Sequence, residues 1–148
     1  MSSKGKQKTN AREQLLLKRL VSYFATSGEY IKLNEIINSK GKRKLSMRKI
    51  DDFILNYSKE NNIMYESKKY GEKHIFNVYN EYKDALNGNK KELFDTFCRT
   101  TTLVIQFTDK IKIRATPAVL NLLMWAIQNK VIDYMEKNWD EIYCTESV

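Results

Sequence analysis

Apolar residues recur every three or four positions in several stretches of this 148-residue chain, a spacing that predicts helices buried along one face. The first predicted helix covers residues 11–26, and Leu16, Leu20 and Phe24 form its apolar stripe. Gly28 follows it closely, and glycine is the favoured residue just past the end of a helix. An amphipathic helix is therefore the first element predicted, and it follows a polar segment of ten residues.

A second long helix is predicted from Ser46, whose hydroxyl is placed to cap it, to about residue 61. Between the two helices we expect a short extended piece over residues 30–33 and a brief helix near residues 34–39. The apolar positions of the second long helix follow the i, i+3, i+4 pattern of a single buried face: Met47, Ile50, Phe53, Ile54 and Tyr57.

The most apolar helix is predicted to start at Thr116, a capping residue, with Pro117 in its first turn. It runs to Met135 as one helix and is apolar around much of its circumference, which places it in the centre of the core. Residues 139–148 either dock on the fold or stay loose. Trp125 and Trp139 are interpreted as packing residues.

Two β-hairpins and a broken helix complete the prediction. One hairpin pairs residues 63–66 with 73–79. The other pairs a strand that contains residues 103–107 with residues 111–115, across the two turn residues Asp109-Lys110, which lack the usual glycine. Residues 80–99 read as two helical pieces hinged at 87–89. Three apolar side chains of the second piece are expected to be buried: Leu93, Phe94 and Phe97.

These elements indicate an α+β fold. Residues 1–10 read as a flexible basic tail, and residues 11–80 as a winged-helix-like three-helix unit with a hairpin. Residues 81–148 form a helix–hairpin–helix part packed against that unit, ending in the long apolar helix. In winged-helix proteins the third helix enters the major groove of DNA and the hairpin, or wing, contacts the backbone or the minor groove.

Charge separates the two parts of the chain. Residues 1–80 hold 17 Lys and Arg against 8 Asp and Glu, whereas residues 81–148 hold 9 against 10. The formal net charge of +8 therefore belongs to the first half. Concentrated positive charge is typical of a surface that binds a polyanion, so we expect the first half to carry a nucleic-acid interface.

The expected interface consists of two segments. One is the start of the third helix, which is the second long helix from Ser46 to about residue 61, and the other is the turn of the first hairpin. Lysines and arginines there would contact phosphates, which supplies affinity without sequence readout. Arg48 and Asn56 are the side chains able to read base edges. The complete set of candidate residues is Lys42, Arg43, Lys44, Arg48, Lys49, Asn56, Lys68 and Lys69.

Two carboxylates weigh against this interface, because Asp51 and Asp52 lie in the same helix and at least one would face a phosphate backbone. Many winged helices bind proteins rather than DNA. The alternative function is a protein-interaction or self-associating structural component, which would use the exposed apolar remainder of the last helix. DNA is favoured over RNA, and the basic residues at 40–49 could also be only a solvated face.

The sequence favours a protein without enzymatic activity. It has no glycine-rich phosphate loop, and its single histidine, His74, serves neither a metal motif nor a catalytic triad convincingly. Cys98 and Cys144 lack the spacing of a zinc site and are expected to be reduced thiols. We therefore expect no cofactor, no metal and no small-molecule substrate. No apolar run reaches the length of a membrane span, so a soluble protein is expected.

Several stretches resemble a family of uncharacterised proteins of giant viruses, the nucleocytoplasmic large DNA viruses. The stretches span roughly residues 45–135 and follow the family's order: 45–58, 76–79 with Tyr82-Lys83, 94–99, and Leu120-Asn121 with 125–127. The family's pattern has Pro at the position of Thr96, and Phe at the positions of Leu122 and Leu123. The resemblance implies a viral protein of the host cytoplasm or the virion, and brings no known activity.

Overall fold

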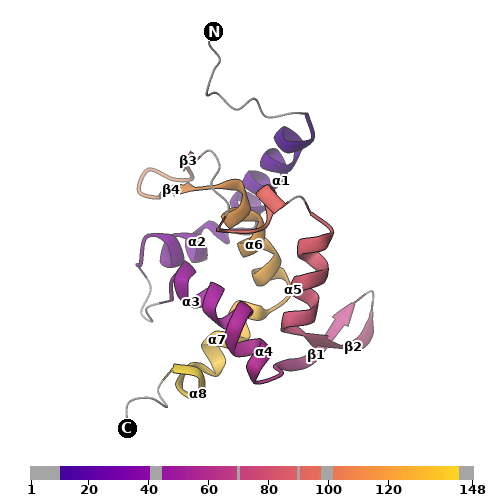
Figure 1. Cartoon of the computed structure of the whole chain (residues 1–148). Coiled ribbons are helices and arrows are strands. Elements are labelled where there is room, and N and C mark those ends of the chain that lie inside the picture. Colours follow the sequence, from indigo (N-terminus) through magenta and orange to yellow (C-terminus); the bar gives the residue numbers. More distant parts are fainter. Residues whose placement is uncertain (1–10, 41–44, 70, 90, 98–101, 144–148) are drawn as a thin grey trace.

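The protein is described here by a computed structural model, which covers residues 11–40, 45–69, 71–89, 91–97 and 102–143. It is an α+β fold of helices and two separate antiparallel hairpins (Figure 1). The elements are α1 Ala11–Ser27, α2 Tyr30–Ile37, α3 Met47–Asp52, the π-helical η1 Phe53–Tyr57, α4 Ser58–Glu60, β1 Met64–Lys69, β2 Glu72–Asn77, α5 Val78–Asn87, the 3-10 helix η2 Lys91–Leu93, β3 Leu103–Gln106, β4 Lys112–Ala115, α6 Pro117–Gln128, α7 Val131–Lys137 and α8 Trp139–Tyr143.

Helix α1 confirms the first predicted helix, but the extended piece predicted over residues 30–33 is wrong. Gly28 adopts a φ of +79° and turns the chain, and α2 begins two residues later. Leu33 and Ile36 are both fully or almost fully buried, a spacing of three that only a helix places on one face. Residues 30–33 are therefore helical because a helix buries Leu33 and Ile36 on the same face.

The second long helix is confirmed as the continuous run α3–η1–α4. Its start is capped as expected, because the Ser46 hydroxyl accepts a hydrogen bond from the backbone N–H of Lys49. Ile50, Phe53 and Ile54 are buried. The middle of the run is a π-helical turn, and the buried Ser58 hydroxyl donates to the Ile54 carbonyl at 2.7 Å. That bond satisfies a polar group inside the core.

Both predicted hairpins are present, but their strands begin and end at residues other than those predicted. Strands β1 and β2 pair from Met64 opposite Asn77 to Lys69 opposite Glu72, so the first strand is longer, the second ends two residues earlier, and the turn is shorter than predicted. In the second hairpin, β3 and β4 are linked by more than the two predicted turn residues. The Thr108 hydroxyl accepts from the backbone N–H groups of Lys110 and Ile111 and so holds a turn that has no glycine.

The segment after the first hairpin departs from the prediction at its end. Helix α5 ends at Asn87 near the expected hinge, and only the short η2 follows it. Leu93 and Phe94 are buried as predicted. Phe97 is instead 68% exposed, because the helix does not continue to it and residues 94–97 run as a turn.

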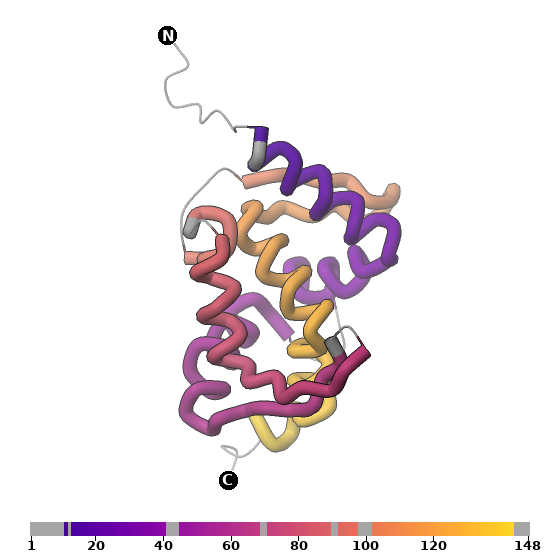
Figure 2. The backbone as a smooth tube through the Cα atoms, turned by 90° about the vertical axis from the view of Figure 1, so that its right-hand side faces the viewer, coloured from indigo at the N-terminus to yellow at the C-terminus, as the bar shows by residue number. Residues whose placement is uncertain are grey.

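The long apolar helix is broken in two. Helix α6 has the predicted Thr116 cap, with the hydroxyl accepting from the Val119 N–H, but it ends at Gln128. Lys130 adopts a left-handed φ of 65°, and α7 starts after it in a new direction (Figure 2). Because the chain changes direction at this break, α7 packs against the core. Three of its side chains are buried there: Val131, Ile132 and Met135. Helix α8 then docks the end of the described chain.

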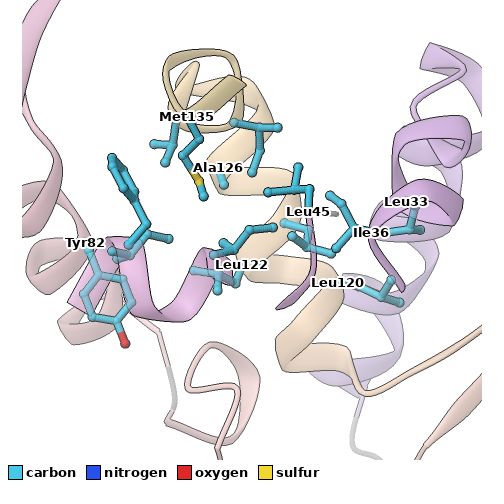
Figure 3. Packing of buried hydrophobic residues seen from close by; sticks show 14 of the residues in the cluster. Leu33, Ile36, Leu45, Tyr82, Leu120, Leu122, Ala126 and Met135 are labelled. Atoms are coloured by element: carbon cyan, nitrogen blue, oxygen red, sulfur yellow. The ribbon is translucent and has the colours of Figure 1, made fainter. Parts of the chain in front are cut away.

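One buried cluster joins both halves of the sequence, and α6 runs through its middle (Figure 3). Leu120 and Leu122 of α6 lie between Leu33 and Ile36 on one side and Tyr82 on the other. Trp125 contacts the rings of Phe76, Tyr82 and Phe94. These contacts confirm the prediction that Trp125 is a packing residue. None of the described helices combines the length and apolar character needed to cross a membrane.

Asn121 is the polar residue inside this apolar helix, and it is 6% exposed. Its side-chain amide donates to the Leu93 carbonyl at 2.8 Å and so ties η2 to α6. We expect Asn121→Ala to destabilise the protein by about 1–3 kcal/mol, because the buried carbonyl would lose its partner. Urea unfolding measures the difference.

Gln128→Ala, at the exposed end of the same helix, is the control and should change stability by less than about 0.5 kcal/mol. Equal stabilities of the two variants would contradict a structural role for the Asn121 bond.

Candidate nucleic-acid interface

The predicted interface residues divide into two groups. Lys42, Arg43 and Lys44 lie outside the described residues. Of the others, Arg48 and Lys49 lie on α3, Asn56 on η1, and Lys68 and Lys69 at the end of β1. The helix residues and the hairpin residues line different surfaces, which are described in turn.

The first surface is a cleft beside α3, with a volume of about 470 Å³. Arg48, Asp52 and Asn56 are exposed along it at helical spacing. The Asn56 amide donates to the Asp52 carboxylate at 2.8 Å, so this amide already has an acceptor. The cleft is lined by Arg48, Asp51, Asp52, Leu55, Asn56 and Phe97, and we call it the Phe97 cleft.

Asp51 forms the inner wall of the Phe97 cleft. The Thr96 hydroxyl lies 3.0 Å from both of its carboxylate oxygens and donates to them, which joins the loop after η2 to α3. The pKa of Asp51 is raised to about 6, chiefly by burial; the Thr96 hydrogen bond opposes the shift, and the nearby Asp95 carboxylate adds to it. The cleft is therefore acidic, although it lies on the predicted recognition helix.

Two cations of the basic first half have partners within the fold. The Lys49 ammonium lies 4.8 Å from the ring centroid of Trp139 and 5.1 Å from that of Tyr143. The Lys49 carbonyl accepts from the Tyr143 hydroxyl at 3.3 Å, so α8 docks on α3. Lys32 bridges α2 to α7 through Glu136 at 2.8 Å. The positive charge available to a ligand is accordingly smaller than the sequence indicates.

The second surface is a cleft of about 600 Å³ between β1 and the α6–α7 corner. Three lysines line it: Lys68 from the hairpin, and Lys130 and Lys137 from the two ends of α7. All three are exposed. The remaining lining residues are Tyr65, Glu66, Ser67, Gln128, Asp133 and Tyr134, and we call this surface the lysine cleft.

Aromatic contacts hold the walls of the lysine cleft together. The rings of Tyr65 and Tyr134 stack with centroids 5.4 Å apart, and the Tyr65 hydroxyl donates to the Asn129 carbonyl at 2.6 Å. Burial raises the pKa of Tyr65 well above its usual value, and the neighbouring Asp133 adds to the shift. The hairpin is thereby fixed against α7, with Lys68 facing the α7 lysines across the cleft.

The cleft lysines outnumber its carboxylates, Glu66 and Asp133. The only ion pair that the described residues form within the cleft joins Lys130 to Asp133 at 4.0 Å, with both side chains more than half exposed. Such a pair is weak and is easily exchanged for an anionic ligand. The described lining of the lysine cleft therefore carries one more positive than negative side chain.

Sequence reasoning missed Lys130 and Lys137, because both lie in the electrically neutral half of the chain. Their spacing of seven places them on one face of α7, but nothing local links that face to Lys68, more than sixty residues earlier. The Phe97 cleft and the lysine cleft share no lining residue. In Figure 1 the strands β1 and β2 lie at the right of the molecule, apart from the start of α3 at the left.

The residues considered for catalysis or metal binding do not converge within the described part of the chain. No group of three or more His, Cys, Asp and Glu residues there could hold a metal ion. His74 packs edge-on against Phe76, and its Nδ1 is buried without a described hydrogen-bond partner. Cys98 and Cys144 lie outside the described residues.

Comparison with known proteins identifies relatives without an assigned activity. A family of unknown function, DUF7197, matches residues 1–145. An uncharacterized protein, L507, of Acanthamoeba polyphaga mimivirus is 39% identical over 142 residues, which is 92% of this chain and 54% of the relative. The chain thus spans about half the length of this curated relative. No solved structure matches. The resemblance to an uncharacterised giant-virus family is confirmed.

Asp51→Asn tests the electrostatic cost of the Phe97 cleft. Because the folded-state pKa is raised from 3.8 to about 6, the native state holds the proton more tightly than the unfolded chain. The stability that Asp51 contributes is then fully present below about pH 4 and is lost as the pH rises through about 6. We expect Asp51→Asn to be more stable than the parent at about pH 8, by about 1 kcal/mol after solvent screening, and to lose this advantage near pH 4.

Urea unfolding at both pH values measures the effect. Asp109→Asn, at an exposed carboxylate of the β3–β4 turn, controls for the change in net charge. The same pH dependence in Asp51→Asn and the parent would show that Asp51 has no raised pKa.

Proposed function

The chain belongs to the DUF7197 family of unknown function, and from that premise we propose that it is a non-enzymatic viral nucleic-acid-binding protein with a preference for DNA over RNA. The proposed contact surface is the lysine cleft and the adjoining β1–β2 hairpin. The proposed place of action is the viral factory in the host cytoplasm or the virion.

The observation that carries the proposal is the convergence of Lys68, Lys130 and Lys137 on one cleft. They come from both halves of the chain, and only Lys130 has an ion-pair partner among the described residues. Lysines that line an open groove neutralise phosphates and release the counterions condensed on a nucleic acid. Tyr65 and Tyr134 supply a rigid aromatic wall between them.

The order of the elements supports a winged-helix-like mode in which the wing is the main contact. Three helical runs, α1, α2 and α3–α4, precede the β1–β2 hairpin. In this proposal the hairpin serves as the wing, and Lys68 and the exposed Lys73 lie on it. In this mode the hairpin approaches the phosphate backbone, and α7 flanks it.

The third helix has a smaller part in the proposal than the sequence suggested. Asp51 and Asp52 line the same cleft as Arg48 and Asn56, and carboxylates repel a phosphate backbone. Lys49 is held by the aromatic rings of α8. Phosphate contacts are therefore assigned to the hairpin side, and a role for Lys42, Arg43 and Lys44 stays a prediction.

A protein-interaction role remains the second candidate, but on a different surface. The apolar helix expected to provide it is buried in the chain's own core, since Leu120, Leu122, Leu123 and Ala126 are at most 1% exposed. The observation that now favours a protein contact is the exposed ring of Phe97.

Salt-dependent binding to a duplex of about 20 base pairs tests the main proposal. We expect measurable affinity at about 50 mM salt and a steep loss by about 200 mM, as counterion release requires. The variant Lys68/Lys130/Lys137→Ala should bind more weakly, and the slope of log K against log salt should fall by about 2–3, since each lost phosphate contact removes about 0.9. Fluorescence anisotropy measures both.

The matched control is Lys18/Lys110/Lys112→Ala, which removes three exposed lysines elsewhere and changes the net charge equally. Equal losses in the two variants would mean that only net charge matters and would reject the lysine cleft. Absence of binding at about 50 mM salt would reject nucleic-acid binding itself. Lys42/Arg43/Lys44→Ala, measured alongside, tests the basic segment before α3.

A further inference from the structure

The Phe97 cleft combines an exposed aromatic ring with carboxylates, and neither feature serves the proposed nucleic-acid contact. Phe97 is 68% exposed, whereas Phe94, three residues earlier, is 1% exposed. A large aromatic side chain that faces water on an ordered turn is a common feature of protein-binding surfaces. These two features suggest that the cleft binds a ligand other than nucleic acid.

Two hydrogen bonds hold the backbone turn that carries this aromatic side chain. The backbone N–H of Phe97 donates to the Asp95 carboxylate at 2.9 Å, and the neighbouring Thr96 hydroxyl donates to Asp51 on α3. The turn is thus attached to the helix directly beside the exposed ring. A backbone turn that is fixed in advance loses little conformational freedom when a partner covers the ring it carries, which favours binding.

The charge of the cleft indicates the chemistry of the partner. Asp51 and Asp52 line it and Asp95 lies next to Asp51, whereas Arg48 is the one cationic residue among the described residues that line it. None of these three carboxylates forms an ion pair with a lysine or arginine of the described residues. A local excess of negative charge on a protein of net charge +8 complements a cationic ligand and repels a nucleic acid.

The apolar part of the cleft distinguishes a protein segment from a simple cation. Leu55 is partly buried beside Phe97 and continues the apolar surface onto the helix. An apolar side chain of a partner would cover Leu55 and Phe97, while a lysine or arginine next to it would reach Asp51 and Asp52. An aromatic ring also attracts such a cation through its face.

We propose that the Phe97 cleft is a docking site for a protein segment that carries a lysine or arginine next to an apolar side chain. This site is separate from the proposed nucleic-acid surface, because the two clefts share no lining residue. A virus protein with both sites would connect a nucleic acid to a second protein. The two proposals succeed or fail independently.

The test uses the full chain, labelled for nuclear magnetic resonance, and a short blocked peptide that alternates lysine and leucine. We expect saturable shifts at Asp51, Asp52, Leu55 and Phe97, and little binding of the matched peptide with glutamate in place of lysine. Phe97→Ser should weaken binding about tenfold, since it removes the apolar contact. Asp52→Asn should weaken it less, through the charge alone.

Val104→Ser is the control, because Val104 is a 52% exposed apolar residue of β3 outside the cleft. Its variant should bind the peptide as the parent does. Both substituted side chains are exposed, so both variants should keep the parent spectrum elsewhere. Equal binding of the lysine and glutamate peptides, or an unchanged affinity of Phe97→Ser, would overturn the proposal. So would shifts of the cleft residues with oligothymidylate and none with the lysine peptide.

Discussion

The fold depends on the burial of helix α6 on most of its sides. Ala118, Leu120, Leu122, Leu123 and Ala126 are all at most 1% exposed, so no side of this helix can be left to water without a large loss of hydrophobic stabilisation. The chain therefore surrounds α6 with elements from both halves. α1 packs against it, α2 packs against the neighbouring β4, and aromatic side chains of β2, α5 and the η2 turn meet at Trp125. The one polar residue buried in α6, Asn121, holds η2 in place from within.

The two clefts are consequences of that packing. Because α6 ends at Gln128 and Lys130 reverses the chain, α7 comes to lie beside the hairpin, where Tyr65 bonds to the Asn129 carbonyl. The lysine cleft forms at this corner. At the other side, the turn after η2 reaches α3 through Thr96 and Asp51, and the Phe97 cleft forms there. Among the lining residues described, lysines are thus in excess at one surface and carboxylates at the other.

Local patterns predicted most of the elements, since capping residues and apolar spacing act over a few residues. Ser46 and Thr116 cap helices as their positions indicate, and the stripe around Leu20 and Phe24 is buried. The wrong predictions have tertiary causes. Residues 30–33 became helical to bury Leu33 with Ile36, the apolar helix broke at Lys130 to return α7 to the core, and Phe97 remained outside because the chain turns before it.

The sequence by itself determined the α+β class, the capped helices, the two hairpins, the buried character of α6 and the membership of a giant-virus family. The tertiary structure alone decided which charges meet. Lys68 lines the same cleft as Lys130 and Lys137 only because the hairpin and α7 pack on the same end of α6. The Lys49 ammonium contacts the rings of Trp139 and Tyr143 only because α8 docks on α3. The physical reason is one of range: helix and turn preferences depend on neighbours within a few residues, whereas the position of a surface charge depends on how the whole apolar surface of the chain is buried.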